Sequence, residues 1–188
     1  MNRTYEENVA LWAGEFGLEY EKRNKPSSAQ TRQRRFMLTQ LLGVSLQNDH
    51  LKVLEVGCGA GHNLNILNNL LPSYEALYGV DVNRSLLDAI QWDRPSCPWV
   101  DTFCIDALHL PFRDGFFDLV FTVGTLIHVL PEVALREAYQ EILRVTQRGG
   151  FICLAEYFSP TPSSISYRGI DEGVLWKRDF GGELLDEA

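Results

Sequence analysis

The chain has 188 residues, of which 45% are hydrophobic, and it carries a formal net charge of −8 at pH 7. A chain of this length is expected to form one domain that buries about 70% of its unfolded surface. The acidic balance argues against a nucleic-acid partner, which would need a basic face, and the basic cluster Arg32, Arg34 and Arg35 is interpreted first as a solvated helix face and second as an anion site.

Residues 1–48 are predicted to form an N-terminal helical flap. Trp12, Phe16 and Tyr20 recur at intervals of four, which would place the three rings on one face of a helix. Packing of this face onto the rest of the domain is the first interpretation. An aromatic lid that excludes water from a bound ligand is the second. A further helix is expected over residues 31–46.

From residue 49 to residue 188, strands and helices alternate. Strands are predicted at 51–56, 76–82, 99–106, 117–123 and 151–158, and helices at 63–71, 85–91 and 131–145. Gly149 and Gly150 are expected to end the last helix and to turn the chain into the fifth strand. This alternation predicts an α/β fold with a doubly wound, Rossmann-like, mostly parallel sheet. A ligand would then lie at the carboxyl ends of the strands.

The first strand leads into a glycine-rich turn, with the sequence V-L-E-V-G-C-G-A-G-H-N from Val53 to Asn63. Gly57, Gly59 and Gly61 would let a ligand lie against the backbone and would permit positive φ. The third glycine comes one place too early for a dinucleotide fingerprint. Glu55 would repel a pyrophosphate but can accept hydrogen bonds from an ammonium group. The ligand implied is S-adenosylmethionine, and the chain resembles the class I methyltransferases over most of its length.

Two further acids stand at the ends of later strands. Asp81 comes about 20 residues after the glycines, where an acid grips ribose hydroxyls in nucleotide folds. In the resembling superfamily, an acid at the position of Asp106 receives the exocyclic amine of adenine, which suits a group that only accepts hydrogen bonds. A helix N-cap is the alternative role for Asp106. The remaining predicted cofactor contacts are Cys58, Asn63, Val82, Ala107, Leu108 and Val123.

His128 is the candidate catalytic residue. It lies in the segment T-V-G-T-L-I-H-V-L-P after the fourth strand, where the superfamily often meets the sulfonium and the substrate. The ordinary pKa of histidine suits a general base near neutral pH. The alternative, weighted equally, is a histidine that packs beneath or caps the helix beginning at Pro131.

Longer strings give a more specific resemblance, among them W-A-G-E-F-G-L-E-Y-E-K-R-N, A-E-Y-F-S-P-T-P-S-S-I-S-Y-R-G and K-R-D-F-G-G-E-L-L-D. They are similar to the pseudaminic acid biosynthesis-associated methylases. The resemblance implies methylation of a small polar acceptor, an acidic or nucleotide-activated sugar, in surface-carbohydrate biosynthesis. Arg168 is favoured for a carboxylate or phosphate, with a surface ion pair as the alternative. Lys177 and Arg178 would also face the acceptor. The substrate-binding residues expected are Trp12, Tyr20, Glu156, Tyr157, Tyr167 and Arg168.

The end of the chain departs from the resembling superfamily. Class I methyltransferases finish with a sixth strand and an antiparallel seventh, but no strand pair is evident after Pro162, so the C-terminal strand pair is expected to be missing. An exposed fifth strand would favour a homodimer. Two rival functions are an NAD-dependent sugar oxidoreductase, which would need a glycine where His62 stands, and a non-catalytic cofactor-binding or scaffold protein.

Cysteine usage and hydropathy bound the remaining properties. The four cysteines contain no C-x-x-C pair, so we expect reduced thiols and a cytoplasmic location. No apolar run approaches membrane-spanning length, so no membrane partner is expected. Histidines and carboxylates lack ligand spacing, so no metal site is expected either.

Overall fold

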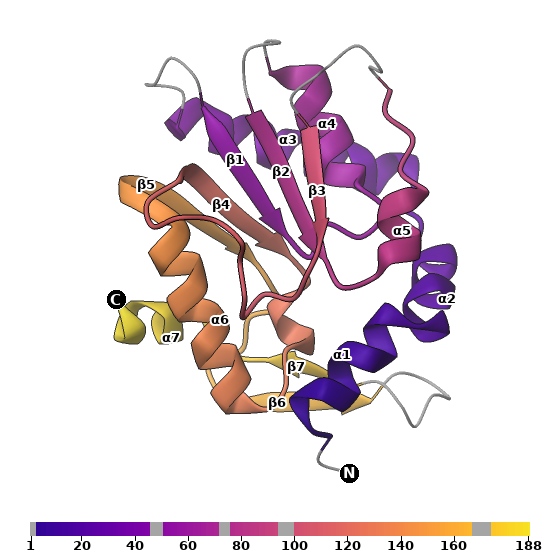
Figure 1. Cartoon of the computed structure of the whole chain (residues 1–188), viewed down its shortest axis with the longest axis vertical. Coiled ribbons are helices and arrows are strands. Elements are labelled where there is room, and N and C mark those ends of the chain that lie inside the picture. Colours follow the sequence, from indigo (N-terminus) through magenta and orange to yellow (C-terminus); the bar gives the residue numbers. More distant parts are fainter. Residues whose placement is uncertain (1–2, 46–50, 72–75, 94–99, 167–173) are drawn as a thin grey trace.

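A computed structural model describes residues 3–45, 51–71, 76–93, 100–166 and 174–188. Its main sheet has five strands in the order β3-β2-β1-β4-β5, and every neighbouring pair is parallel (Figure 1). This arrangement confirms the predicted doubly wound α/β fold. The strands are β1 (Lys52–Val56), β2 (Ala76–Asp81), β3 (Val100–Cys104), β4 (Phe117–Val123) and β5 (Thr146–Ala155).

Helices cover both faces of this sheet. Their bounds are α3 (Ser28–Ser45), α4 (His62–Leu70), α5 (Arg84–Asp88), α6 (Glu132–Val145) and α7 (Phe180–Glu187). Val53 packs with Leu38 of α3 and Leu67 of α4, whereas its neighbour Leu54 packs in a second cluster with Tyr139 of α6. Successive side chains of a strand point to opposite faces. A strand buried on both faces therefore appears in the sequence as a continuous apolar run.

The N-terminal segment differs from the single aromatic helix face that the sequence suggests. The helix is interrupted at Gly14, so that Trp12 lies on α1 (Tyr5–Ala13) while Phe16 and Tyr20 lie on α2 (Glu15–Arg23). The rings still meet, because the Trp12 centroid lies 5.0 Å from that of Phe16 and 5.1 Å from that of Tyr20. A domain boundary at residue 48 remains a prediction, and α3, which precedes it, contributes Leu38 to the main core.

Strand β5 begins earlier than the sequence indicates. Helix α6 ends at Val145 and the strand follows at once, so Gly149 and Gly150 lie within the strand and do not end the helix. A Cβ at Gly150 would stand 2.9 Å from the carbonyl oxygen of Asp118 on the neighbouring strand, so a residue with a side chain would clash there and glycine fits. The strand ends at Ala155 and not at residue 158.

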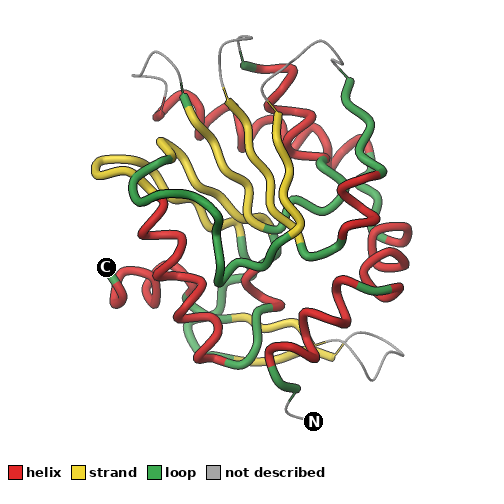
Figure 2. The backbone as a smooth tube through the Cα atoms, in the orientation of Figure 1, coloured by secondary structure: helices red, strands yellow, loops and turns green. Residues whose placement is uncertain are grey.

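The C-terminal tail contains a strand pair that the sequence did not reveal. Strands β6 (Ser163–Ser166) and β7 (Val174–Lys177) pair antiparallel as a separate two-stranded sheet (Figure 2). Within the described residues the main sheet ends at β5, as predicted, and a homodimer formed through this edge remains a prediction. The hairpin lies beside η1 (Leu126–His128), the short 3₁₀ helix after β4.

Three of the four cysteines fall in the described part of the chain. Cys58, Cys104 and Cys153 carry free thiols, and burial raises the pKa of the Cys58 thiol well above its ordinary value. Cys97 lies outside the described residues. None of the helices in the described ranges combines the length and the apolar character that a bilayer crossing requires.

Candidate functional site

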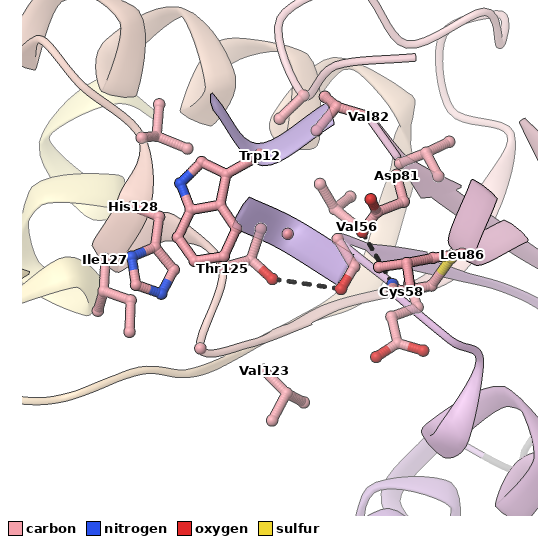
Figure 3. A pocket seen from close by; sticks show the side chains of 18 of the residues that line it. Trp12, Val56, Cys58, Asp81, Val82, Leu86, Val123, Thr125, Ile127 and His128 are labelled. Atoms are coloured by element: carbon pink, nitrogen blue, oxygen red, sulfur yellow. Dashed lines mark hydrogen bonds between the residues drawn. The ribbon is translucent and has the colours of Figure 1, made fainter. Parts of the chain in front are cut away.

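A cavity of about 430 Å³ lies at the carboxyl ends of the central strands and is lined in part by residues of α1 and α2 (Figure 3). This volume is in the range of small-molecule sites. The three acids singled out from the sequence, Glu55, Asp81 and Asp106, all line it. So do the predicted cofactor contacts Gly57, Cys58, Gly59, Asn63, Val82, Ala107 and Val123. Gly61 and Leu108 do not line the cavity.

The predicted substrate residues are divided between this cavity and the undescribed part of the chain. His128 lines the cavity, and so do Trp12, Tyr20, Glu156 and Tyr157. Tyr167 and Arg168 lie outside the described residues. Arg178 does not line the cavity: its Nε lies 2.6 Å from Oε1 of Glu183. The expectation that Arg178 faces an acceptor is therefore wrong, because its guanidinium is engaged on α7.

The three glycines of the turn have positive φ, at 76°, 51° and 70° for Gly57, Gly59 and Gly61. Their surroundings differ. A Cβ at Gly57 would stand 2.2 Å from Oγ1 of Thr125, and one at Gly61 would stand 3.0 Å from Cδ1 of Ile90. At Gly59 the nearest atom would be 3.8 Å away. Of the three, only Gly59 could carry a Cβ without a clash, whereas a Cβ at Gly57 or Gly61 would crowd a neighbouring side chain.

Glu55 is a buried acid with an unused acceptor. Its side chain is on β1 and the residue is only 1% exposed. Oε1 accepts a hydrogen bond of 2.6 Å from Nδ2 of Asn63. Among the described residues, neither Oε2 of Glu55 nor Oδ1 of Asn63 has a hydrogen-bond partner. These two buried oxygens belong to residues that line the cavity, and they suit a ligand group that only donates hydrogen bonds, such as an ammonium.

Burial also sets the charge of these acids. Desolvation raises the pKa of Glu55 to about 8, although the hydrogen bond from Asn63 opposes the rise. Desolvation raises the pKa of Asp81 as well, against the hydrogen bonds that its carboxylate accepts. A cationic ligand beside these groups would favour their ionised forms.

Asp81 joins two backbone segments at the end of β2. Its Oδ2 accepts a hydrogen bond of 2.8 Å from the backbone N–H of Gly59, and its Oδ1 accepts one of 2.8 Å from the backbone N–H of Asn83. Each carboxylate oxygen keeps a further lone pair. The carboxylate is thus held rigidly against the glycine turn and can still accept from a ligand hydroxyl.

Asp106 is held by the loop after β3. Its Oδ1 accepts hydrogen bonds of 2.9 Å from the backbone N–H of Leu108 and 2.9 Å from Nδ1 of His109. The hydroxyl of Tyr5 on α1 also bonds to it, and the pKa of Tyr5 is raised first by burial and then by this acid. No helix begins after Asp106 in this described loop, so the N-cap alternative is wrong.

Aromatic rings close one end of the cavity. The centroid of Trp12 lies 4.4 Å from that of His128, and the centroid of Tyr20 lies 6.1 Å from that of His128. Figure 3 shows Trp12 and His128 together at one end, with Asp81, Cys58 and Leu86 at the other. The side-chain amide of Asn8 on α1 donates to the backbone carbonyl of His128. The cavity is therefore bounded by residues from α1, α2 and η1.

Glu156 supports the turn that carries His128. Its carboxylate accepts hydrogen bonds of 2.7 Å from Oγ1 of Thr122, 3.0 Å from the N–H of Thr125 and 3.3 Å from the N–H of Ile127. Desolvation raises its pKa against these hydrogen bonds. The carboxylate is therefore committed to protein groups. Its predicted contact with a substrate would have to share these oxygens.

Three residues at the rim were not selected from the sequence as site residues. Nε2 of His62 lies 2.6 Å from Oε1 of Glu21, which pairs the glycine turn with α2. The pKa of Glu21 is lowered, first by its hydrogen bond with His62 and in smaller part by the positive charge of Arg34. The same charge of Arg34 opposes the rise in the pKa of Glu55. The only sequence signal was the basic cluster around Arg34. In the described ranges, no group of three His, Cys, Asp or Glu side chains could hold a metal ion.

Comparison with known proteins adds a family match. Residues 54–154, more than half of the chain, match a family model described as a methyltransferase domain. A phthiotriol/phenolphthiotriol dimycocerosates methyltransferase from Mycobacterium ulcerans is 33% identical over 135 residues, which cover 71% of this chain and 44% of that protein. A tRNA (carboxymethyluridine(34)-5-O)-methyltransferase, alkbh8 of Xenopus tropicalis, is 32% identical over 98 residues, 52% of this chain and 14% of that one.

Solved structures agree on the fold. The structure of a SAM-dependent methyltransferase from Aquifex aeolicus is similar with a TM-score of 0.55 and 20% identity, and the match covers 69% of this chain and 66% of that chain. The chain spans less than half the length of the two curated relatives. These relatives act on different kinds of substrate by their names, so the acceptor does not follow from similarity.

Proposed function

Because this chain belongs to the methyltransferase domain family, we propose that it transfers a methyl group from S-adenosylmethionine to a small polar acceptor. One observation carries the proposal: Glu55, Asp81 and Asp106 line a single cavity beside the glycine turn. An adenosyl amino acid has an ammonium, a ribose and an adenine amine, which are the three donor groups that such acids can receive.

The chain's own groups suggest how the donor would be oriented. Oε2 of Glu55 and Oδ1 of Asn63, which have no partner within the described residues, would accept from the ammonium. Asp81 would accept from the ribose hydroxyls, and Asp106 from the adenine amine. Among the described residues, Arg34 is the one Lys or Arg side chain that lines the cavity, and it would face the carboxylate of the amino-acid tail.

The aromatic end of the cavity would serve the transfer itself. The bound donor supplies an electrophilic methyl group on a sulfonium, and its displacement requires an aligned acceptor. His128 would remove the proton from an acceptor hydroxyl. Trp12 and Tyr20 would exclude water from this end. Glu156 would hold the turn from Thr125 to Ile127, which fixes the position of His128.

For the acceptor we favour an acidic or nucleotide-activated sugar of surface-carbohydrate biosynthesis. The long strings near both ends of the chain support this class. Tyr157 lines the cavity and is 56% exposed, and Nζ of Lys177, which lies outside the lining, stands 5.9 Å from the centroid of its ring. Lys177 forms no ion pair with any described residue, so it could meet an anion. A role for Arg168 stays a prediction.

Calorimetry with S-adenosylmethionine, S-adenosylhomocysteine and NAD tests the donor. We expect micromolar binding of the two adenosyl amino acids and no measurable binding of NAD. Tight NAD binding without S-adenosylmethionine binding would contradict the proposal and would favour an oxidoreductase. Transfer of a radiolabelled methyl group to a panel of nucleotide-activated and free nine-carbon acidic sugars, with neutral hexoses as the matched set, then tests the acceptor class.

A further inference from the structure

The helices α1 and α2 are attached to the rim of the donor cavity by polar contacts. On one side the amide of Asn8 donates to the carbonyl of His128. On another, His62 pairs with Glu21. Between them, Nδ2 of Asn83 donates to the carbonyl of Trp12 at 2.9 Å and to that of Gly14 at 3.2 Å. Figure 1 shows α1 and α2 lying next to the ends of the strands and to α5.

Asn83 also contacts Asp81, the acid that would bind the methyl donor. The residue is 1% exposed and stands two positions after Asp81. Its backbone N–H donates to Oδ1 of Asp81 at 2.8 Å, and its side-chain Oδ1 accepts from the N–H of Leu86 at 3.1 Å, where it caps α5. The buried residue Asn83 thus connects Asp81, the start of α5 and the junction between α1 and α2.

Glycine at position 17 permits this junction to lie close to Asn83. A Cβ at Gly17 on α2 would stand 2.1 Å from the carbonyl oxygen of Trp12 and 2.9 Å from Nδ2 of Asn83. The absence of a side chain at Gly17 therefore allows α2 to pack directly over the hydrogen bonds. The Trp12 carbonyl that Asn83 holds belongs to the residue whose ring faces His128.

We propose that Asn83 is a positioning residue that fixes α1 and α2 over the donor cavity, so that donor binding at Asp81 and closure of these helices stabilise each other. The inference rests on the proposed function, since it takes the ligand of Asp81 to be an adenosyl amino acid. Opening of the helices would leave the buried amide of Asn83 without its two acceptors, which opposes opening. A ligand that bridges Asp81 and the helices would favour the closed state by its differential affinity.

Two substitutions separate this role from capping of α5. Asn83→Asp keeps an oxygen that accepts from the N–H of Leu86. Its second oxygen replaces the amide nitrogen and cannot donate to the carbonyls of Trp12 and Gly14. Asn83→Ser keeps a capping oxygen without added charge and is too short to reach the carbonyls. The matched control is Asn65→Ser, because Asn65 makes the same kind of bridge, to the carbonyl of Gln91 at 2.9 Å and from the N–H of Asp93 at 3.0 Å, away from α1 and α2.

The measurement is amide hydrogen exchange of residues 4–24 with and without S-adenosylhomocysteine, together with its dissociation constant by calorimetry. In the parent protein and in Asn65→Ser, we expect the ligand to slow exchange in this segment by about tenfold or more. In Asn83→Asp and Asn83→Ser we expect the slowing to fall below about twofold, and the dissociation constant to rise about tenfold, as loss of the two hydrogen bonds implies.

The outcomes distinguish a failure of the proposed function from a failure of the coupling through Asn83. If S-adenosylhomocysteine does not bind the parent protein, the proposed function and this inference both fail. If it binds but leaves exchange of residues 4–24 unchanged, or protects the Asn83 variants as fully as the parent, the coupling through Asn83 is wrong while the proposed function stands. A thermal unfolding midpoint close to that of the parent checks that each variant is folded.

Discussion

The ring of Trp12 on α1 faces the ring of His128 on η1, with 4.4 Å between the centroids and an angle of 43° between the planes. These residues lie far apart in the sequence, and their contact joins the N-terminal helices to the turn after β4. His128 is 9% exposed, so its imidazole is mostly covered by this contact and by its own turn. Trp12 and His128 both line the cavity, so an acceptor that reaches His128 would lie beside the Trp12 ring.

The role of His128 as a base predicts a loss confined to turnover. With an acceptor identified from the sugar panel, His128→Ala should lower kcat by about 100-fold or more, because general-base catalysis contributes at least that factor. Donor affinity measured by calorimetry should stay within about threefold. A variant whose turnover stays within about threefold of the parent would leave His128 with a packing role only.

Glu55 predicts a stability that depends on pH. Its pKa is about 8 in the folded protein and 4.5 ordinarily, so between these values the folded state holds a proton that the unfolded chain has lost. The free energy of unfolding of the donor-free protein should therefore fall as the pH rises from 4.5 toward 8, and this contribution should level off above about pH 8. Burial raises the pKa of Asp81 and of Glu156 too, which gives the same sign.

Glu55→Gln isolates this contribution, because glutamine keeps the shape without the charge. Thermal unfolding midpoints from pH 5 to pH 9 should decline less steeply in the variant than in the parent, and the variant should be the more stable of the two at pH 9. Its affinity for S-adenosylmethionine should fall. Parallel pH profiles for the two proteins would contradict the raised pKa of Glu55.

The glycine turn predicts different costs at two neighbouring glycines. Gly57→Ala would bring a Cβ within 2.2 Å of the Thr125 hydroxyl, so it should destabilise the fold by about 2–4 kcal/mol in thermal or denaturant unfolding. In Gly59→Ala the added Cβ would meet only Oε2 of Glu21, at 3.8 Å, so the change should cost only about 1–2 kcal/mol for its left-handed φ. It should instead weaken donor binding. Equal stability losses would argue against this difference in surroundings.

Much of the sheet could be predicted from the sequence, for a physical reason. Strands of a parallel sheet are buried on both faces, so the run Val53–Val56 is continuously apolar except for Glu55 and ends at a glycine turn. The parallel pairing of β1 with β2 and β4 then brings Glu55 and Asp81 to one edge of the sheet. Local pattern and topology agree here.

Long-range contacts could not be predicted in this way. Spacing by four placed Trp12 and Tyr20 on one helix, but the periodicity carries no sign of the break at Gly14. Nor does it show that Asn83, distant in the sequence, donates to the carbonyls of Trp12 and Gly14 at this break. Nor could local sequence reveal that Arg34 lines the cavity. The other two arginines of its cluster, Arg32 and Arg35, are exposed, and the sequence pattern does not distinguish Arg34 from them. The strands of the C-terminal hairpin span four residues each, too short to show alternation.

The most direct test of the central claim is the affinity of S-adenosylmethionine for Asp81→Ala, measured by calorimetry beside the parent and the control Asp101→Ala. Asp101 is an exposed acid on β3, so its loss should leave affinity unchanged. We expect at least about tenfold weaker binding for Asp81→Ala, because a charged hydrogen-bond acceptor for the ribose is removed. Equal affinity in all three proteins would contradict the assignment of this cavity to an adenosyl donor.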